Sequence, residues 1–405
     1  MNEKWKAENY FVSPSNFEDK ATRDFRFSES LEIHDVTLRD GEQQPGVAFT
    51  KQDKIEIAKM LSEIGVHRIE AGMPAVSQSD YEAIGEIAKL GLSSKIFVFS
   101  RAMEEDIQNA VDLGVNGVVV EIPANEELIL HGYNWPTDRP IKAACEACRL
   151  AHENGLFVNL FLMDSSRLSV DRFVEMVKEV KKNSWIDSCT IVDTQGVLSF
   201  PGARYMISEA VKALGIPVEA HFHNDIGCGT ANALAAFEAG ASALHTTVLG
   251  IGPRAGQAAT EQVALALKLH YGYDSGIKLD SLYSLDKRVA ELALIKAPGN
   301  QPVAGDLIYQ IEAGMPAAWW PRVEKEHPLS LYGILPEVIG QPPVEIVLGK
   351  GSGAPSISYW LDKLNLKLKD ENDTAQILQD VKNKGLAEKR PLTQAEFKEI
   401  VKDYI

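Results

Sequence analysis

The 405-residue sequence has few cysteines, no excess of positive charge and no long apolar run. Four cysteines in a chain of this length are too few for a disulfide scaffold. The formal net charge of −16 argues against nucleic acid or an anionic membrane as the main partner. No segment approaches the roughly 18 consecutive apolar residues of a membrane-spanning helix, and the polar start MNEKWKAENYF lacks the apolar core of a signal peptide. We therefore expect a cytoplasmic protein with no nucleic-acid or membrane partner.

Cys145 and Cys148 form a C-x-x-C pair, a spacing that zinc and redox sites use. The pair lies within the helical pattern IKAACEACRLAHENG, and the sequence has no second such pair. We interpret the two cysteines as small residues on one helix face.

From Leu31 onward, β-like apolar runs alternate with amphipathic helical runs. The eight strand candidates are residues 31–38, 67–73, 95–100, 117–123, 157–164, 188–194, 217–223 and 243–250. Eight strand–helix units in about 240 residues match the size of a closed barrel. An open, doubly wound sheet is the alternative, but regular alternation without a Gly-rich dinucleotide turn favours the barrel. We predict an α/β fold, a (β/α)₈ TIM barrel with its active site at the carboxyl ends of the strands.

The alternation stops after about residue 272, and the sequence then changes character. A helical pattern over 280–296 is followed by a Pro- and Gly-rich stretch and by a charged helical pattern at the end. The predicted domains are an N-terminal arm (1–30), a catalytic barrel (31–275), a helix and linker subdomain (276–355) and a mainly helical C-terminal subdomain (356–405).

The strongest local feature is HFHND, residues 221–225. Alternate side chains of a strand share a face, so His221 and His223 point the same way. Neutral imidazoles are common ligands of divalent transition metals. In TLRDGEQQPG, Asp40 follows the first predicted strand and can add a carboxylate ligand, while Arg39 can donate to a carbonyl or carboxylate oxygen. Asp-Gly alone is a common turn pair, but both features at the same end of one barrel predict a metal site.

Four segments, in order, resemble the family of isopropylmalate, homocitrate and citramalate synthases and hydroxymethylglutaryl-CoA lyase. They are LEIHDVTLRDGEQQPGVAFT, IEAGMPAVSQSDYEAI, HFHNDIGCGTANALAAFEAGA and VLGIGPRAGQAATEQVALAL, and together they fall within residues 31–270. A weaker likeness continues through LYGILPEVIGQPPVEIVLGKGSG. The resemblance implies a pyruvate carboxyltransferase-like barrel enzyme of amino-acid biosynthesis. It also implies a divalent metal (Mg, Mn or Zn), an acyl-CoA co-substrate and a homodimer.

The resemblance also assigns roles to individual residues of this sequence. They are the metal ligands Asp40, His221 and His223, the catalytic residues Arg39, Gln43 and Tyr332, and the substrate-binding residues Thr194 and Arg254. A 2-oxo acid can chelate a metal through its keto and carboxylate oxygens. The metal and Arg39 then stabilise the alkoxide that develops during attack or cleavage.

Three departures from the family pattern concern the catalytic groups. The sequence GIGPRAGQ ends in Gln257, where lyase-type members have an asparagine that can complete the metal shell, so Gln257 is an additional candidate ligand. Met163 replaces the acid of the synthases' E-D-A-T-R segment. The stretches 310–315 and 349–353 lack the synthases' histidines. Because proton removal from an acetyl methyl needs a positioned base, the base is left unassigned.

The sequence leaves more than one activity open. The first is condensation of an acyl-CoA with a 2-oxo acid. The alternative is a metal-dependent lyase or aldolase acting on a hydroxy acid. A non-catalytic barrel is a third interpretation, against which the retained metal residues argue. GKGSG (349–353) lacks the full spacing of a phosphate-binding P-loop, and Trp319 and Trp320 are expected in packing.

Overall fold

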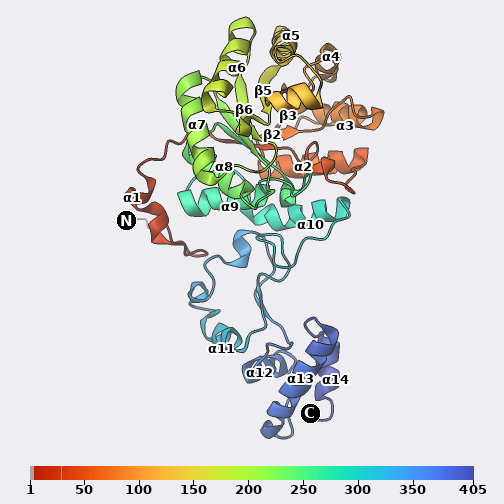
Figure 1. Ribbon diagram of the computed structural model, residues 1–405. Coiled ribbons are helices and arrows are strands. Elements are labelled where there is room, and N and C mark those ends of the chain that lie inside the picture. The colour runs from red at the N-terminus through yellow and green to blue at the C-terminus, as the bar shows by residue number, and fades with distance from the viewer. Residues whose placement is uncertain (1–3, 29) are drawn as a thin grey trace. The chain divides into compact units, whose positions relative to one another are not determined.

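The computed structural model describes residues 4–28 and 30–405 (Figure 1). The described chain forms two compact units, one of residues 15–297 and one made of the segments up to residue 14 and from residue 298. The predicted arm (1–30) is thus divided between the units, and its residues 1–3 and 29 lie outside the described residues. Each unit is described by itself below.

The larger unit is a closed barrel of eight parallel strands in sequential order, with β8 returning to β1. The TIM-barrel prediction is confirmed, and each predicted strand contains one of the observed ones. The strands are β1 (Glu32–Asp35), β2 (Arg68–Glu70), β3 (Lys95–Ser100), β4 (Gly117–Pro123), β5 (Phe157–Met163), β6 (Ser188–Asp193), β7 (Val218–Phe222) and β8 (Ala243–Thr246).

From α2 (Lys51–Ile64) onward, helices of this unit surround the barrel, while the short α1 (Asp19–Thr22) lies to one side (Figure 1). The helices after α2 are α3 (Gln78–Lys89), α4 (Glu104–Leu113), α5 (Arg139–Glu153), α6 (Val170–Asn183), α7 (Phe200–Leu214), α8 (Gly229–Glu238), α9 (Thr260–Tyr271) and α10 (Leu282–Leu292). Cys145 and Cys148 are free thiols within α5, as the helical interpretation expects. No helix in the described part of the chain is long and apolar enough to cross a membrane.

Helix α2 shows how local sequence sets an element's limits. Thr50 accepts a hydrogen bond from the Asp53 N–H, and the Asp53 carboxylate accepts one from the Thr50 N–H, which forms a capping box. The helix ends at Gly65 with φ +99°, a left-handed conformation that glycine adopts without steric cost. A Cβ there would lie 2.6 Å from the Gly276 carbonyl oxygen, so glycine is required at this position.

The barrel unit extends beyond the predicted limit at residue 275. Helix α10 packs against α2, and Arg288 donates to both carboxylate oxygens of Glu56 at 2.6 and 3.2 Å. Residues 276–297 therefore belong with the barrel, not with the linker subdomain in which the sequence analysis placed them.

The interior of the barrel contains ionisable side chains beside an aromatic cluster. Phe97, Phe99 and Phe161 belong to that cluster. The buried ionisable residues that strands β1, β2, β7 and β8 carry toward one another are His34, Arg68, Glu70, Glu219 and His245. Buried charges persist only when they are paired, so this layer supports the residues at the strand ends through specific contacts.

The smaller unit is mainly helical, as predicted. It contains α11 (Gly314–Val323), α12 (Ala354–Lys363), α13 (Thr374–Glu388), α14 (Gln394–Val401) and the short parallel pair β9 (Gln310–Ile311) and β10 (Glu345–Ile346). Helix α11 lies in the Pro- and Gly-rich stretch and places Trp320 in a small core, while Trp319 is 47% exposed. In GKGSG the Gly351 N–H donates to Glu312 (2.7 Å). The Glu312 carboxylate thus accepts from a backbone N–H group that a bound phosphate would need as a donor.

Candidate active site

A cavity of about 580 Å³ opens at the carboxyl ends of the barrel strands. Each of the eight strands, or the segment that follows it, contributes to the wall. This is the end of the barrel at which TIM-barrel enzymes place their active sites, and the volume suits a small-molecule ligand. Much of the wall is apolar, with Met73, Phe99, Tyr133 and Met163 among its residues.

Asp40, His221 and His223 converge in this cavity. Asp40 Oδ2 lies 3.7 Å from Nε2 of both histidines, whose Nε2 atoms are 3.3 Å apart. Two ligands bound at about 2.1 Å to a tetrahedral cation lie roughly 3.4 Å apart. The three side chains predicted as metal ligands are therefore spaced as a divalent ion requires, although they are far apart in sequence.

Both imidazoles are held in the neutral form that binds metals. Burial, and then the neighbouring rings His223 and His245, hold the pKa of His221 well below its usual value. Burial also lowers the pKa of His223, although Asp40 opposes that shift. His223 Nδ1 lies 3.2 Å from the Gly256 carbonyl oxygen. Because a carbonyl only accepts, Nδ1 carries the proton and Nε2 keeps its lone pair for a cation.

Gln257 reaches the same group of ligands. An isolated antiparallel bridge pairs it with His223, and its Nε2 donates to Asp40 Oδ2. Its Oε1 is buried and has no hydrogen-bond partner among the described residues. A buried acceptor without a partner is costly. Rotation of the side-chain amide by 180° exchanges its nitrogen and its oxygen, so that the oxygen can serve as a ligand to a cation bound beside Asp40. The donor set of one carboxylate, two neutral imidazoles and an amide fits a divalent metal ion.

Arg39 lies beside the predicted metal ligands and is fixed by two carboxylates. Its Nε donates to Glu70, its Nη1 donates to Asp40 Oδ1 (2.6 Å), and its guanidinium carbon lies 4.2 Å from the centre of the Phe99 ring. Burial raises the pKa of Glu70, but Arg39 and His34 outweigh it and lower this pKa to about 2. The remaining nitrogen, Nη2, is buried without a partner among the described residues. It is a donor available to a ligand oxygen.

Glu121 is a cavity residue that the sequence analysis missed. It lies on β4, is partly buried, and forms no hydrogen bond or ion pair with the described residues. Burial raises its pKa to about 7, even though Arg39 acts in the opposite direction. The signal in the sequence is a single acid within the apolar run GVVVEIP, where a strand interior otherwise excludes charge.

The two predicted substrate-binding residues and Gln43 also line the cavity. The Thr194 hydroxyl accepts from the Asp164 N–H (2.8 Å) and keeps its own proton for donation. The Arg254 guanidinium donates to both oxygens of Asp225 at 2.8 and 3.1 Å. Its charge is thus partly neutralised before a substrate arrives.

Tyr332 belongs to the smaller unit, so its predicted catalytic role stays a prediction. Its ring packs against Trp320 (5.5 Å between ring centres) and Tyr309 (5.4 Å). Burial raises the pKa of its phenol.

The sequence relationships agree with this geometry. The HMGL-like family model matches residues 30–289, more than half of the chain. The chain belongs to the HMGL-like family.

This HMGL-like chain is 32% identical over 375 residues to homocitrate synthase AksA of Methanothermobacter thermautotrophicus, with 92% of the chain and 93% of the relative covered. It is 36% identical over 342 residues to (R)-citramalate synthase CimA of Methanocaldococcus jannaschii, with 84% and 68% covered. These names agree with the family resemblance expected from the sequence motifs, and they support an acyltransferase enzyme.

A solved structure, that of hydroxymethylglutaryl-CoA lyase from Pseudomonas aeruginosa, matches 69% of this HMGL-like chain and 97% of its own chain with a TM-score of 0.60. Its sequence identity of 19% means that the likeness supports the barrel fold alone.

Proposed function

We propose that this chain is a metal-dependent acyltransferase that condenses an acyl-CoA with a 2-oxo acid, as homocitrate, citramalate and isopropylmalate synthases do. The observation that carries the proposal is the convergence of Asp40, His221 and His223 beside the unmatched donor of Arg39. Its relatives of nearly the same length are synthases, which favours condensation over cleavage. The product then serves amino-acid biosynthesis.

The metal-binding residues of this proposal are Asp40, His221 and His223, with Gln257 as a further candidate. A bound Mg, Mn or Zn ion would supply Lewis-acid polarisation of the keto oxygen of the 2-oxo acid. Arg39 donates from Nη2 to the same oxygen as negative charge develops on it. The Thr194 hydroxyl donates to the substrate carboxylate, since its acceptor capacity is already used by Asp164 N–H.

We assign the proton transfer to Glu121, because it is a carboxyl group of the cavity that no described residue engages. Its carboxylate takes a proton from the carbon next to the thioester carbonyl. The carbon lone pair then forms the carbon–carbon bond to the keto carbon, and the C=O electrons move to the keto oxygen. That oxygen takes back the proton held by Glu121 and becomes the hydroxyl group of the product, which returns Glu121 to its carboxylate form. Water afterwards cleaves the C–S bond, which releases the CoA thiol and leaves a carboxylate. Gln43 and Tyr332 remain candidate participants.

Two further parts of the proposal come from the family resemblance. We propose a homodimer, with the smaller unit helping to pair the subunits, and a cytoplasmic location. Mass measurement in solution by light scattering tests the first, and a monomer at micromolar concentration contradicts it.

The activity test is release of free thiol from acetyl-CoA with a panel of 2-oxo acids, in the presence of Mn²⁺. We expect thiol release with at least one 2-oxo acid, and none after addition of a chelator. Two results contradict the proposal: no thiol release with any pair, or release of a 2-oxo acid or an acyl-CoA from a hydroxy acid without free thiol. The second result identifies a lyase.

A further inference from the structure

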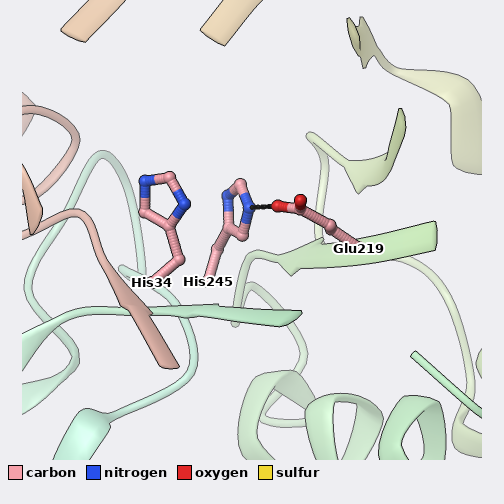
Figure 2. A group of neighbouring side chains, drawn as sticks. All are labelled: His34, Glu219 and His245. Carbon is pink, nitrogen blue, oxygen red and sulfur yellow. Dashed lines mark hydrogen bonds and ion pairs between the residues drawn. The ribbon is translucent and has the colours of Figure 1, made fainter. Parts of the chain in front are cut away.

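We propose that His245 and Glu219 are positioning residues for the metal ligand His221: they form a buried chain that determines which His221 nitrogen carries the proton. The inference rests on the proposed metal site. It concerns the group of side chains drawn in Figure 2, in which His245 is joined to Glu219 and His34 lies next to His245.

Strand geometry places these residues in contact. Glu219 and His221 are two residues apart on β7, so they share the inner face of the barrel. His245 on β8 pairs in register with His221. The Nδ1 atoms of His221 and His245 are 3.4 Å apart, and His245 Nε2 lies 3.0 Å from Glu219 Oε2. All three residues are at most 1% exposed, so water does not compete for these contacts.

With both imidazoles neutral, the chain allows one arrangement of protons. Glu219 also accepts from Arg68 Nη1 (2.8 Å), and a carboxylate paired with a guanidinium is ionised and only accepts. His245 must therefore carry its proton on Nε2, which leaves a lone pair on its Nδ1. His221 then donates from its own Nδ1. Its Nε2 is left with a lone pair, directed at Asp40 and His223.

The two metal-binding histidines thus obtain the same tautomer by different means. His223 donates to a backbone carbonyl, whereas His221 donates to a second imidazole that a carboxylate holds in place. Outer partners of this kind orient metal ligands, and their loss commonly weakens metal binding 10- to 100-fold.

A second metal ion is the competing explanation for this group, because ligand atoms of His34, Glu219 and His245 lie within 4.8 Å of one another. Two contacts argue against it. Arg68 already places a positive charge on Glu219, and His245 Nε2 would have to give up its hydrogen bond to Glu219. His34 contributes only ring packing to His245, with ring centres 4.4 Å apart.

The experiment measures Mn²⁺ binding to metal-free protein, with the free ion followed by electron paramagnetic resonance. Three variants are compared with wild type: His245→Phe, Glu219→Gln and, as a matched control, His34→Phe. The control changes an equally buried histidine that touches His245 but makes no hydrogen bond to His221. Glu219→Gln keeps the side-chain volume. Its amide oxygen faces Arg68 and its NH₂ group faces His245, which forces the opposite tautomer on both histidines.

We expect wild type to bind one Mn²⁺ per chain, with binding 10- to 100-fold weaker in His245→Phe and in Glu219→Gln and within threefold of wild type in His34→Phe. The double variant that combines His245→Phe with Glu219→Gln should bind Mn²⁺ no more weakly than the worse of these two single variants, since both changes break the same chain. Unchanged Mn²⁺ binding in folded Glu219→Gln overturns the inference. The inference is also overturned if wild type binds two Mn²⁺ ions and His34→Phe loses one of them. Wild type that binds no Mn²⁺ instead contradicts the proposed metal site itself.

Discussion

Arg39 and Glu70 form a buried ion pair that links the segment after β1 to the last residue of β2. The pair fixes the guanidinium so that Nη1 donates to Asp40, while Nη2 is buried without a partner among the described residues. Since a single ammonium group cannot reproduce this fork, Arg39→Lys should keep metal binding and lower kcat/KM for thiol release about 100- to 1000-fold.

The control for this change is Arg101→Lys. Arg101 also lines the cavity, but its guanidinium is bound to Asp106 at 2.8 and 2.9 Å. The Arg101→Lys substitution should change kcat/KM less than threefold. Equal losses in the two variants would remove Arg39 from its assigned role.

The same ion pair predicts a pH dependence of stability. The pKa of Glu70 is lowered from its ordinary value of 4.5 to about 2, so its ionised form stabilises the fold above pH 4.5. This contribution, on the order of 3 kcal/mol, is lost as the pH falls from 4.5 toward 2. Glu70→Gln should therefore lower the free energy of unfolding at pH 7 by a similar amount, and the gap from wild type should narrow below pH 4.5. Urea unfolding of both proteins at several pH values measures the difference between their free energies of unfolding. A difference that stays constant down to pH 3 contradicts the prediction.

Glu121→Gln tests the assigned proton transfer. The amide keeps the shape of the side chain but cannot accept the proton, so kcat should fall about 100- to 10,000-fold while Mn²⁺ binding persists. Glu127→Gln is the control, because Glu127 is an exposed acid of the following segment that lies near His131 (3.6 Å). Wild-type kcat in Glu121→Gln would assign the proton transfer to another group.

Metal removal should abolish turnover reversibly. Protein treated with a chelator should release no thiol, and added Mn²⁺ should restore the rate in wild type. In Asp40→Ala and His221→Ala the added ion should restore nothing, because two of the three ligand atoms are too few for tight binding. His270→Ala, which changes an exposed histidine outside the cavity, should behave as wild type. Full recovery in Asp40→Ala would show that the carboxylate is not a ligand.

Regular patterns in the sequence were sufficient to predict the barrel. Residues 95–100 and 117–123 were predicted as strands with the bounds that the structure shows, because their apolar runs end in polar or turn residues. Asp40, His221 and His223 could be predicted as neighbours because they lie at the same ends of parallel strands. In a parallel barrel, residues at the carboxyl ends of different strands meet at the same end of the barrel, whatever their separation in sequence.

The partners of the ionisable side chains inside the barrel could not be predicted in the same way. Glu70, Glu121 and Glu219 are each the single acid of a predicted strand, which signals a buried acid but does not name its partner. Arg254 was predicted to bind substrate, but its ion pair with Asp225 could not be predicted. That contact depends on the conformation of two loops, where no periodicity applies. The helix α11 was missed because its prolines resemble those of a linker.

The central claim is that Asp40, His221 and His223 bind one divalent ion, and anomalous X-ray scattering from crystals soaked in Zn²⁺ tests it most directly. We expect a single strong peak at about 2.0–2.2 Å from Asp40 Oδ2 and from Nε2 of His221 and His223. A peak among His34, Glu219 and His245 with none at this position, or no peak within the barrel, would contradict the account.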